Sequence, residues 1–294
     1  MYIVLNWNMS FKFTNTTYTL KSVSSQNGRP YDEDRFRLLA CRGAIFIIVL
    51  DGHGGDTCVN IITNSLEEII LRIFTFLDFT NIQLILDATS QIYIELVNIT
   101  NECQSGSCMA MAIILPNNNM IVSHLGDCRI YVFNHEIVYI SQDHDPIFDN
   151  EGVKTRGGRV SLMNGPRLVG GLGVARAFGD KDIKGVGREP TIQFIGRNWN
   201  QFLITSDCLT DAINRIKIST EQILDENGLP VHIPQYEKQA MTEPLVTEEI
   251  VRIFSSAILG TETKDEAMSV CLASFVSLAK TFPDNYSIVC GSKI

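Results

Sequence analysis

The sequence predicts an α+β fold in which helices cover the outer faces of antiparallel sheets. A continuous apolar run at Ala44–Leu50 indicates a buried strand, and two stretches with helical periodicity follow it. From Ser107 onward, short strand-like runs alternate with turn residues. Strands joined by short turns pair in antiparallel fashion, and strand runs interspersed with helix pairs are typical of layered α+β domains.

The first predicted elements lie close together in the sequence. The run AIFIIVL at Ala44–Leu50 is rich in β-branched residues and stops at Asp51-Gly52, so we expect a buried strand there. In Asp56–Leu77, and again in Asn81–Val97, apolar residues recur at intervals of three and four. This spacing predicts two successive amphipathic helices.

Short strands dominate the rest of the chain. The first group is expected at Met109–Leu115, Met120–Leu125, Arg129–Phe133 and Ile137–Ser141. A second group is expected at Thr191–Ile195, Phe202–Thr205 and Tyr286–Cys290, with helices at about Thr210–Asp225 and Thr247–Lys280. The Gly- and Arg-rich stretch 149–171 is expected to be an irregular, mobile loop, and Asp225–Glu243 a polar, variable one.

Composition narrows the class of protein. A chain of 294 residues suits one large domain or two small ones, and its net charge of −9 argues against a general nucleic-acid binder. The eight cysteines form no Cys-x-x-Cys pair, so we expect reduced, mostly buried thiols and no structural zinc. Neither a signal peptide nor a run of ~20 apolar residues is evident. We therefore expect an intracellular protein, cytoplasmic or nuclear or both, without a membrane partner.

Four acidic residues lie at the ends of predicted strands. Asp51 in VLDGHGG, Asp127 in HLGDCR and Asp207 in ITSDCLTD follow apolar runs, whereas Asp284 in PDNYSIVC precedes one. Carboxylates that converge at a sheet edge repel one another unless a cation holds them. The pattern predicts a hard-metal site built from distant parts of the chain, to which the carbonyl of Gly52 can contribute a further oxygen.

Each candidate residue also has an ordinary structural interpretation. His53 can protonate a leaving oxygen because imidazole titrates near neutrality, although a lone histidine is more often structural. In GRPYDEDRF, Arg29 can grip a phosphate while Glu33 and Asp34 serve a metal, but dense charge is more often a solvated surface. Asp211 and the strand-end acids can be helix caps or turn residues.

The order of the motifs resembles the type 2C, metal-dependent Ser/Thr protein phosphatases. The matching motifs, from about Ser24 to the C-terminus, are GRPYDED, LDGHGG, SGS, LGDCR, DHDP, GLGVARAFGD, ITSDCLTD and DN. The resemblance implies a single domain over residues 1–294, folded as a four-layer α-β-β-α sandwich of two antiparallel sheets flanked by helices. It also implies a cleft at one end that holds two Mn²⁺ or Mg²⁺ ions and a weaker third ion.

The resemblance assigns roles position by position. The implied metal ligands are Asp51 as the bridge, Asp207 and Asp284 for the first ion, and Glu33 with the Gly52 carbonyl for the second. Asp34 would help to order the ligands of the second ion, and Asp127 with Asp211 would serve the third ion. Arg29 matches the family's phosphate-binding arginine, and His53 its proposed general acid.

The implied activity is hydrolysis of phosphoserine and phosphothreonine in proteins by a metal-bridging hydroxide, without a phosphoenzyme. We expect a monomer in which residues 149–171 form a flap beside the cleft and affect substrate choice. The chain has no Cys-x5-Arg loop, so a cysteine-nucleophile phosphatase is not supported.

Two alternatives remain. A catalytically weak or inactive binding module with the same fold would typically have lost ligand carboxylates, whereas every matched acidic position is acidic here. A metal-dependent nuclease would also use clustered carboxylates, but the acidic composition argues against a nucleic-acid track.

Several residues depart from the family pattern without removing a metal ligand. Cys208 stands where glycine is usual, Thr210 where tryptophan is frequent, and Phe282-Pro283 where small residues are common. If the backbone at Cys208 needs a positive φ, a side chain there would introduce strain.

Overall fold

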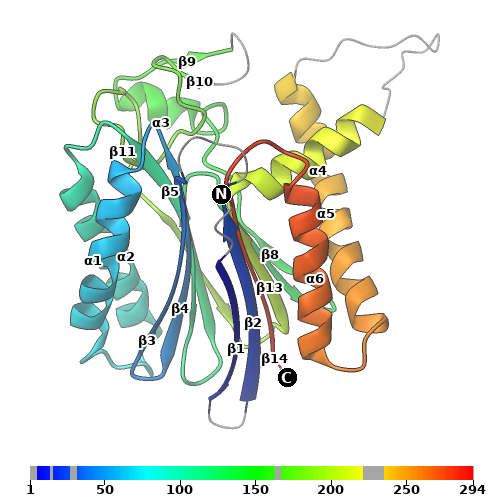
Figure 1. The fold of residues 1–294 in the computed structure, drawn as a ribbon. Helices are drawn as coiled ribbons and strands as arrows, with labels where there is room; N and C mark the ends of the chain where they lie inside the picture. Colours follow the sequence, from blue (N-terminus) through cyan, green and yellow to red (C-terminus); the bar gives the residue numbers. More distant parts are fainter. Residues whose placement is uncertain (1–4, 14–15, 27–31, 163–166, 221–234, 294) are drawn as a thin grey trace.

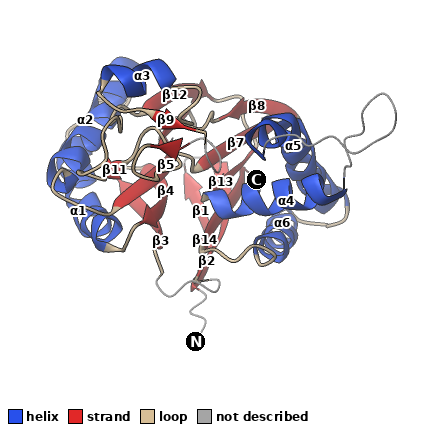
Figure 2. Ribbon diagram, turned by 90° about the horizontal axis from the view of Figure 1, so that it is seen from above, coloured by secondary structure: helices blue, strands red, loops and turns tan. Residues whose placement is uncertain are grey.

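The computed structural model describes residues 5–13, 16–26, 32–162, 167–220 and 235–293. Two antiparallel sheets pack face to face, and helices cover the outer face of each sheet (Figures 1 and 2). The predicted α+β class and its four-layer arrangement are therefore confirmed.

The first sheet, called sheet I, joins the two ends of the described chain. Its strand order is β1-β2-β14-β13-β7-β8, and every pairing is antiparallel. The strands are β1 (Leu5–Phe13), β2 (Thr16–Ser25), β7 (Arg129–Asn134), β8 (Glu136–Ile140), β13 (Gln201–Thr205) and β14 (Tyr286–Lys293). Strand β2, near the start of the described chain, thus pairs directly with β14, the last strand.

The second sheet, called sheet II, has the order β12-β6-β5-β4-β3 and is also antiparallel. Its strands are β3 (Asp34–Cys41), β4 (Ala44–His53), β5 (Gly106–Ile114), β6 (Met120–Leu125) and β12 (Thr191–Gly196). The short strand β11 (Phe178–Gly179) pairs with the beginning of β5.

The helices divide between the two outer faces. Helices α1 (Thr57–Phe74) and α2 (Ile82–Thr100) cover sheet II, whereas α4 (Asp207–Thr220), α5 (Gln235–Leu259) and α6 (Lys264–Ala279) cover sheet I (Figure 1). In α1, Val59, Ile62 and Leu66 are fully buried at helical spacing, which explains why the apolar period predicted this helix.

Strand β4 shows why the apolar run has no polar alternation. Ile45, Ile47 and Val49 face the core between the sheets, while Phe46 and Ile48 face the core beneath α1 and α2. Both faces of the strand are covered, so both sets of side chains must be apolar. A third core, around Phe254 and Phe275 among others, lies between sheet I and helices α4, α5 and α6.

The long helix expected at Thr247–Lys280 is wrong, because two helices occupy this region. Helix α5 ends at Leu259, and α6 begins at Lys264 after a capping box in which Thr263 and Glu266 exchange hydrogen bonds. Gly260 follows α5, and glycine is common where helices stop. Helix α5 also begins at Gln235, inside the stretch expected to be a loop; residues 221–234 lie outside the described part of the chain.

The stretch 149–171 is more regular than expected. It contains helix α3 (Asn150–Thr155) and the hairpin of β9 (Val160–Ser161) and β10 (Arg167–Leu168). The carboxylate of Asp149 accepts hydrogen bonds from Arg156 at 2.7 Å and from Arg176 at 3.2 Å. These two bonds fix the base of the stretch, while its mobility stays a prediction.

All eight cysteines are buried and unbridged, as expected. None of the described helices has the length and apolar character needed to cross a lipid bilayer.

Candidate active site

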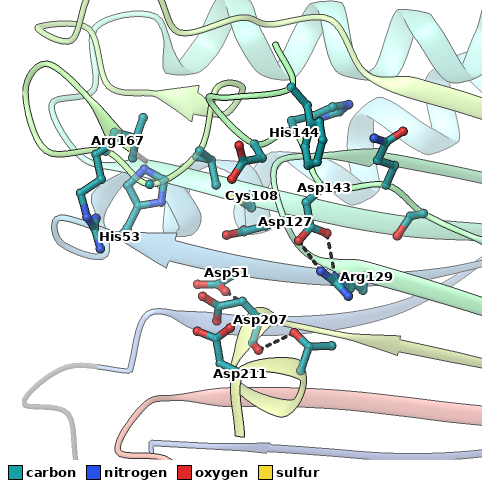
Figure 3. Close-up of a pocket in the computed structure, with 18 of the residues that line it drawn as sticks. Asp51, His53, Cys108, Asp127, Arg129, Asp143, His144, Arg167, Asp207 and Asp211 are labelled. Atoms are coloured by element: carbon teal, nitrogen blue, oxygen red, sulfur yellow. Dashed lines mark hydrogen bonds and ion pairs between the residues drawn. The ribbon is translucent and has the colours of Figure 1, made fainter. Parts of the chain in front are cut away.

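A pocket of about 1610 Å³ is lined by residues at the ends of strands from both sheets (Figure 3). The predicted site residues among its described lining are Asp51, Gly52, His53, Asp127, Asp207, Asp211 and Asp284. The structure thus brings together the four strand-end acids that are widely separated in sequence.

Both sheets contribute to the pocket. Asp51 lies near the end of β4 and Asp127 directly follows the turn after β6, so both come from sheet II. Asp207 begins α4 just after β13, and Asp284 stands two residues before β14, so both come from sheet I. The site therefore exists only where the two sheets are packed against each other.

The carboxylates are close enough to disfavour each other's charge. Burial, followed by the negative charges of Asp207 and Asp34, raises the pKa of Asp51 well above its ordinary value. Burial and neighbouring aspartates also raise the pKa of Asp127 to about 7 and that of Asp211 to about 8. Like charges held together in this way are stabilised by a bound cation.

Asp34 and Glu33 are buried, and neither belongs to the described lining of the pocket. The register of β3 against β4 places Asp34 opposite Asp51. Burial raises the pKa of Asp34 well above its ordinary value, a hydrogen bond to Ser206 opposes the shift, and neighbouring aspartates add to it. Its Oδ2 atom has no hydrogen-bond partner among the described residues. A buried oxygen of this kind calls for a proton or a cation.

Hydrogen bonds join Glu33 to the backbone of the segment that contains Gly52. The N–H of Gly52 donates to the carbonyl oxygen of Glu33 at 3.1 Å, and the N–H of Gly55 donates to Glu33 Oε1 at 2.7 Å. A Cβ atom at position 52 would lie 2.7 Å from the Glu33 carbonyl oxygen. Glycine is therefore required at position 52 by the close approach of two backbone segments.

Asp51 also contacts the start of α4. The N–H of Asp207 points at Asp51 Oδ2 over 3.4 Å, so this carboxylate lies at the positive end of the helix dipole. This contact ties the end of β4 in sheet II to the helix that follows β13 in sheet I.

The acidic side chains of the site have the chemistry that a hard cation requires, but the distances between them are not those of a formed metal site. These side chains are oxygen donors, they raise one another's pKa, and one buried oxygen lacks a partner among the described residues. However, no three His, Cys, Asp or Glu side chains in the described part of the chain are arranged as a ready ligand group. The side chains would have to draw together around an ion.

His53 forms a close pair with Asp180, which sequence analysis did not identify. Its Nε2 atom lies 2.8 Å from Asp180 Oδ2, and only 3% of the Asp180 side chain is exposed. Burial would lower the pKa of His53, but the hydrogen bond and charge of Asp180, with smaller contributions from other acids, raise it above the ordinary value. Asp180 ends the motif GLGVARAFGD. A Gly-Asp pair is typical of a turn, so the sequence does not indicate that Asp180 contacts His53, which lies 127 residues earlier.

A second pair in the lining also escaped sequence analysis. The guanidinium of Arg129 donates to both carboxylate oxygens of Asp143, at 2.8 and 2.6 Å (Figure 3). The pair occupies the motifs LGDCR and DHDP, whose order was noted but whose contact was not predicted. The positive charge of Arg129 partly offsets the effect of the neighbouring acids on Asp211.

The predicted strain at Cys208 is absent. Cys208 lies in the first turn of α4, and it is not among the described non-glycine residues with positive φ, which are Arg42, Asn118, His135 and Asp180. Its buried sulfur lies 3.7 Å from the carbonyl oxygen of Ala279. A helical backbone needs no glycine there, and the side chain fills space beneath the helix. Arg29, the predicted phosphate-binding residue, lies outside the described residues.

Comparison with known proteins gives a consistent result. The family model described as Protein phosphatase 2C matches residues 39–219. The chain is 31% identical over 177 residues to "Probable protein phosphatase 2C 41" of Oryza sativa subsp. japonica, covering 58% of this chain and 62% of that protein. It is 28% identical over 219 residues to "Probable protein phosphatase 2C 58" of Arabidopsis thaliana, covering 69% of this chain and 77% of that protein.

Solved structures share the fold at low sequence identity. The serine-threonine phosphatase 2C from Toxoplasma gondii superposes with a TM-score of 0.69 and 17% identity, over 99% of each chain. A Caenorhabditis elegans sex determining protein superposes with a TM-score of 0.68 and 19% identity, over 93% of this chain and 64% of that one. The matched family model extends over more than half of the sequence and includes β4, the β6–β7 turn and the start of α4. The chain belongs to the protein phosphatase 2C family.

Proposed function

We propose that this chain is a metal-dependent protein serine/threonine phosphatase whose active site is the acidic pocket between the two sheets. The observation that carries the proposal is the convergence of Asp51, Asp127 and Asp207 from both sheets beside His53. Family membership supports a phosphatase, and the mutual repulsion of the carboxylates supports a hard cation.

The acidic residues are proposed to hold two Mn²⁺ or Mg²⁺ ions and a weaker third. The proposed ligands are Asp51 as the bridge, Asp207 and Asp284 on one side, Glu33 and the Gly52 carbonyl on the other with Asp34 behind them, and Asp127 with Asp211 at the third position. Bound there, the ions would make a water molecule more acidic and offset the negative charge of the phosphate.

The remaining roles belong to side chains that contact the substrate. His53 lines the pocket and can give a proton to the oxygen of the departing serine or threonine. Arg29 is proposed to bind the equatorial phosphate oxygens, because a planar guanidinium matches their geometry. Arg129 and Asp143 form a bidentate pair in the wall of the pocket, and we assign neither of them to the substrate.

The test is hydrolysis of phosphoserine and phosphothreonine peptides by the full chain, with phosphotyrosine peptides for comparison. Activity should be lost with a chelator and restored by Mn²⁺ or Mg²⁺. Asp51→Asn and Asp207→Asn should each lower kcat by about 100-fold or more, because each removes a carboxylate that is proposed to bind a metal ion.

The matched control is Asp182→Asn, the same substitution at an exposed residue whose carboxylate accepts a hydrogen bond from Gln104. This variant should keep wild-type activity. A chain that binds Mn²⁺ but hydrolyses none of the peptides would contradict the proposal and favour the inactive binding module.

A further inference from the structure

The imidazole of His53 is held from the side that faces away from solvent. Its Nε2 atom lies 2.8 Å from Asp180 Oδ2, and 29% of the His53 side chain is exposed against 3% for Asp180. A carboxylate only accepts hydrogen bonds, so Nε2 carries the proton of this contact. Among the described residues, Nδ1 has no hydrogen-bond partner and is the nitrogen left to face the substrate.

Several contacts hold Asp180 in a backbone conformation that is unfavourable for most residues. Its φ is 51°, in the left-handed region, although it is not glycine. The N–H of Asp180 donates to the carbonyl of Ser105 at 3.2 Å, and its own carbonyl accepts from Ile183 at 3.0 Å. Arg188 donates to the carbonyls of Ala177 and Gly179, just before Asp180. Strain that the surroundings enforce in this way is common at functional sites.

The neighbouring strand leaves space for the pair. A Cβ atom at Gly106 would lie 2.1 Å from His53 Nε2 and 2.2 Å from Asp180 Oδ2. Any other residue at this position would therefore occupy the place of the hydrogen bond itself. Three separate segments, β4, the start of β5 and the turn after β11, are thus shaped around one contact.

We propose that Asp180 is a positioning residue that fixes the His53 ring so that Nδ1 points at the leaving-group oxygen. The inference rests on the proposed phosphatase function. In the reaction, the oxygen of a water molecule forms a new bond to phosphorus, keeps one proton and releases the other to solvent, and the ester P–O bond breaks with its electron pair on the serine or threonine oxygen. That oxygen takes the proton from Nδ1 of the His53 imidazolium, which becomes a neutral imidazole with its Nε2–H still bonded to Asp180.

The experiment compares two leaving groups in Asp180→Asn. Asparagine tolerates the left-handed backbone and has nearly the same shape, so the turn should persist. For a phosphoserine peptide, whose alkoxide needs a proton to leave, kcat should fall about 10- to 100-fold with little change in KM. For p-nitrophenyl phosphate, whose phenolate leaves without a proton, the loss should stay below about 3-fold, because the acid is not needed.

Three further variants make the comparison specific. Asp182→Asn, two residues away, should change neither rate. His53→Gln should show the same split between the two substrates, and adding Asp180→Asn to it should cause no further loss, because the two residues act through one step. Gly106→Ala should reproduce the split without altering either charge. Equal losses on both substrates in Asp180→Asn, or no loss on either, would overturn the proposal.

A measurement without turnover tests the geometry directly. In metal-free protein with ¹⁵N-labelled histidine, the His53 signal is identified by its absence in His53→Gln. It should show a proton on Nε2 that exchanges slowly with solvent, and a spectrum with Nε2 unprotonated in the wild type would overturn the inference even if a variant failed to fold. A wild-type chain with this signal but no phosphatase activity would contradict the proposed function and leave the pair in place.

Discussion

At the scale of single residues, the pocket and the strand β3 beside it combine groups that are unfavourable together without a ligand. Asp34 and Asp51 face each other across β3 and β4, and burial raises the pKa of both. The bonds to Ser206 and to the N–H of Asp207 compensate only in part. Proteins often accept such a local loss of stability where the charges serve a function.

This arrangement predicts that Asp51→Asn stabilises the metal-free protein while it abolishes activity. The amide keeps the shape of the side chain and removes one buried negative charge. The free energy of unfolding should rise by about 1 to 3 kcal/mol, as measured by urea unfolding in the presence of a chelator.

Asp182→Asn is again the control, and it should change the free energy by less than about 0.5 kcal/mol because the residue is exposed. With saturating Mn²⁺ the order should reverse, since only the wild type gains the full binding energy of the ion. A metal-free Asp51→Asn protein that is less stable than wild type would show that the carboxylates do not repel one another as described.

The sequence predicted some residues of this site and missed others for a physical reason. Asp51, Asp127 and Asp207 stand beside apolar runs, and strand ends that meet at one edge of a sheet bring them together. Asp180 has no such local signal, because its partner His53 is reached only through tertiary packing around Gly106. The likeness to the phosphatase family covered the motif but assigned Asp180 no role.

At the scale of elements, the stretch 149–171 contributes to the pocket without supplying any of the proposed metal ligands. Arg167, Gly170 and Gly171 of this stretch line the pocket, while the bonds of Asp149 to Arg156 and Arg176 anchor its base. The acidic residues come from other elements, so the tip can change without moving them.

We predict that shortening this hairpin alters substrate choice and leaves the chemistry intact. The N–H of Val169 donates to the carbonyl of Arg159 at 2.9 Å, so a two-residue Asn-Gly link in place of residues 160–168 should close the hairpin. Discrimination among phosphopeptides, measured as the ratio of kcat/KM values, should change by about 10-fold or more because Arg167 is removed from the pocket.

The activity on p-nitrophenyl phosphate is the control for this variant and should stay within about 3-fold of wild type. Unchanged ratios among the peptides would contradict a role of the stretch in substrate choice.

Elements were predicted where the apolar pattern is strong and missed where it is weak. The apolar run of β4 is entirely buried, and most apolar residues of α1 are buried along one face, so both patterns were clear. The edge strand β3 has mainly half-buried residues, and β2 mixes serine and threonine with a few apolar residues, so neither was predicted. The break between α5 and α6 was missed because the capping box at Thr263 lies inside a long helical pattern.

At the scale of the whole molecule, a buried histidine pair fastens the segment 141–145 to sheet II. The rings of His124 and His144 stack with their centres 4.6 Å apart. His144 Nδ1 accepts from the N–H of Gly126 at 3.0 Å, and its Nε2–H donates to Thr191 Oγ1 at 2.9 Å. Burial, together with the nearby positive charges of Arg176 and Arg156 and the second histidine, lowers the pKa of His144 to about 3.

This pair predicts a loss of stability in mild acid. Between about pH 6.5 and pH 3, the unfolded chain binds a proton at His144 and the folded chain does not. The unfolded state is therefore favoured as the pH falls, by up to about 1.4 kcal/mol per pH unit for this one group. Because the aspartates of raised pKa stabilise the folded state as the pH falls over the same range, urea unfolding of the metal-free protein is compared between the wild type and a variant at position 144 at several pH values.

His144→Asn isolates this contribution, because its side-chain oxygen can still accept the hydrogen bond from Gly126. The difference in the free energy of unfolding between the wild type and this variant should shrink as the pH falls from 6.5. A difference that stays constant over that range would show that His144 does not titrate as described.

Because the pocket is divided between two sheets, the site is complete only when the sheets are docked. Neither sheet carries the whole site, because Asp51 and Asp127 come from sheet II and Asp207 and Asp284 from sheet I. A chain whose sheets were not docked would therefore lack the assembled acidic pocket. Catalytic competence would report the docking of the two sheets, which secondary structure alone does not reveal.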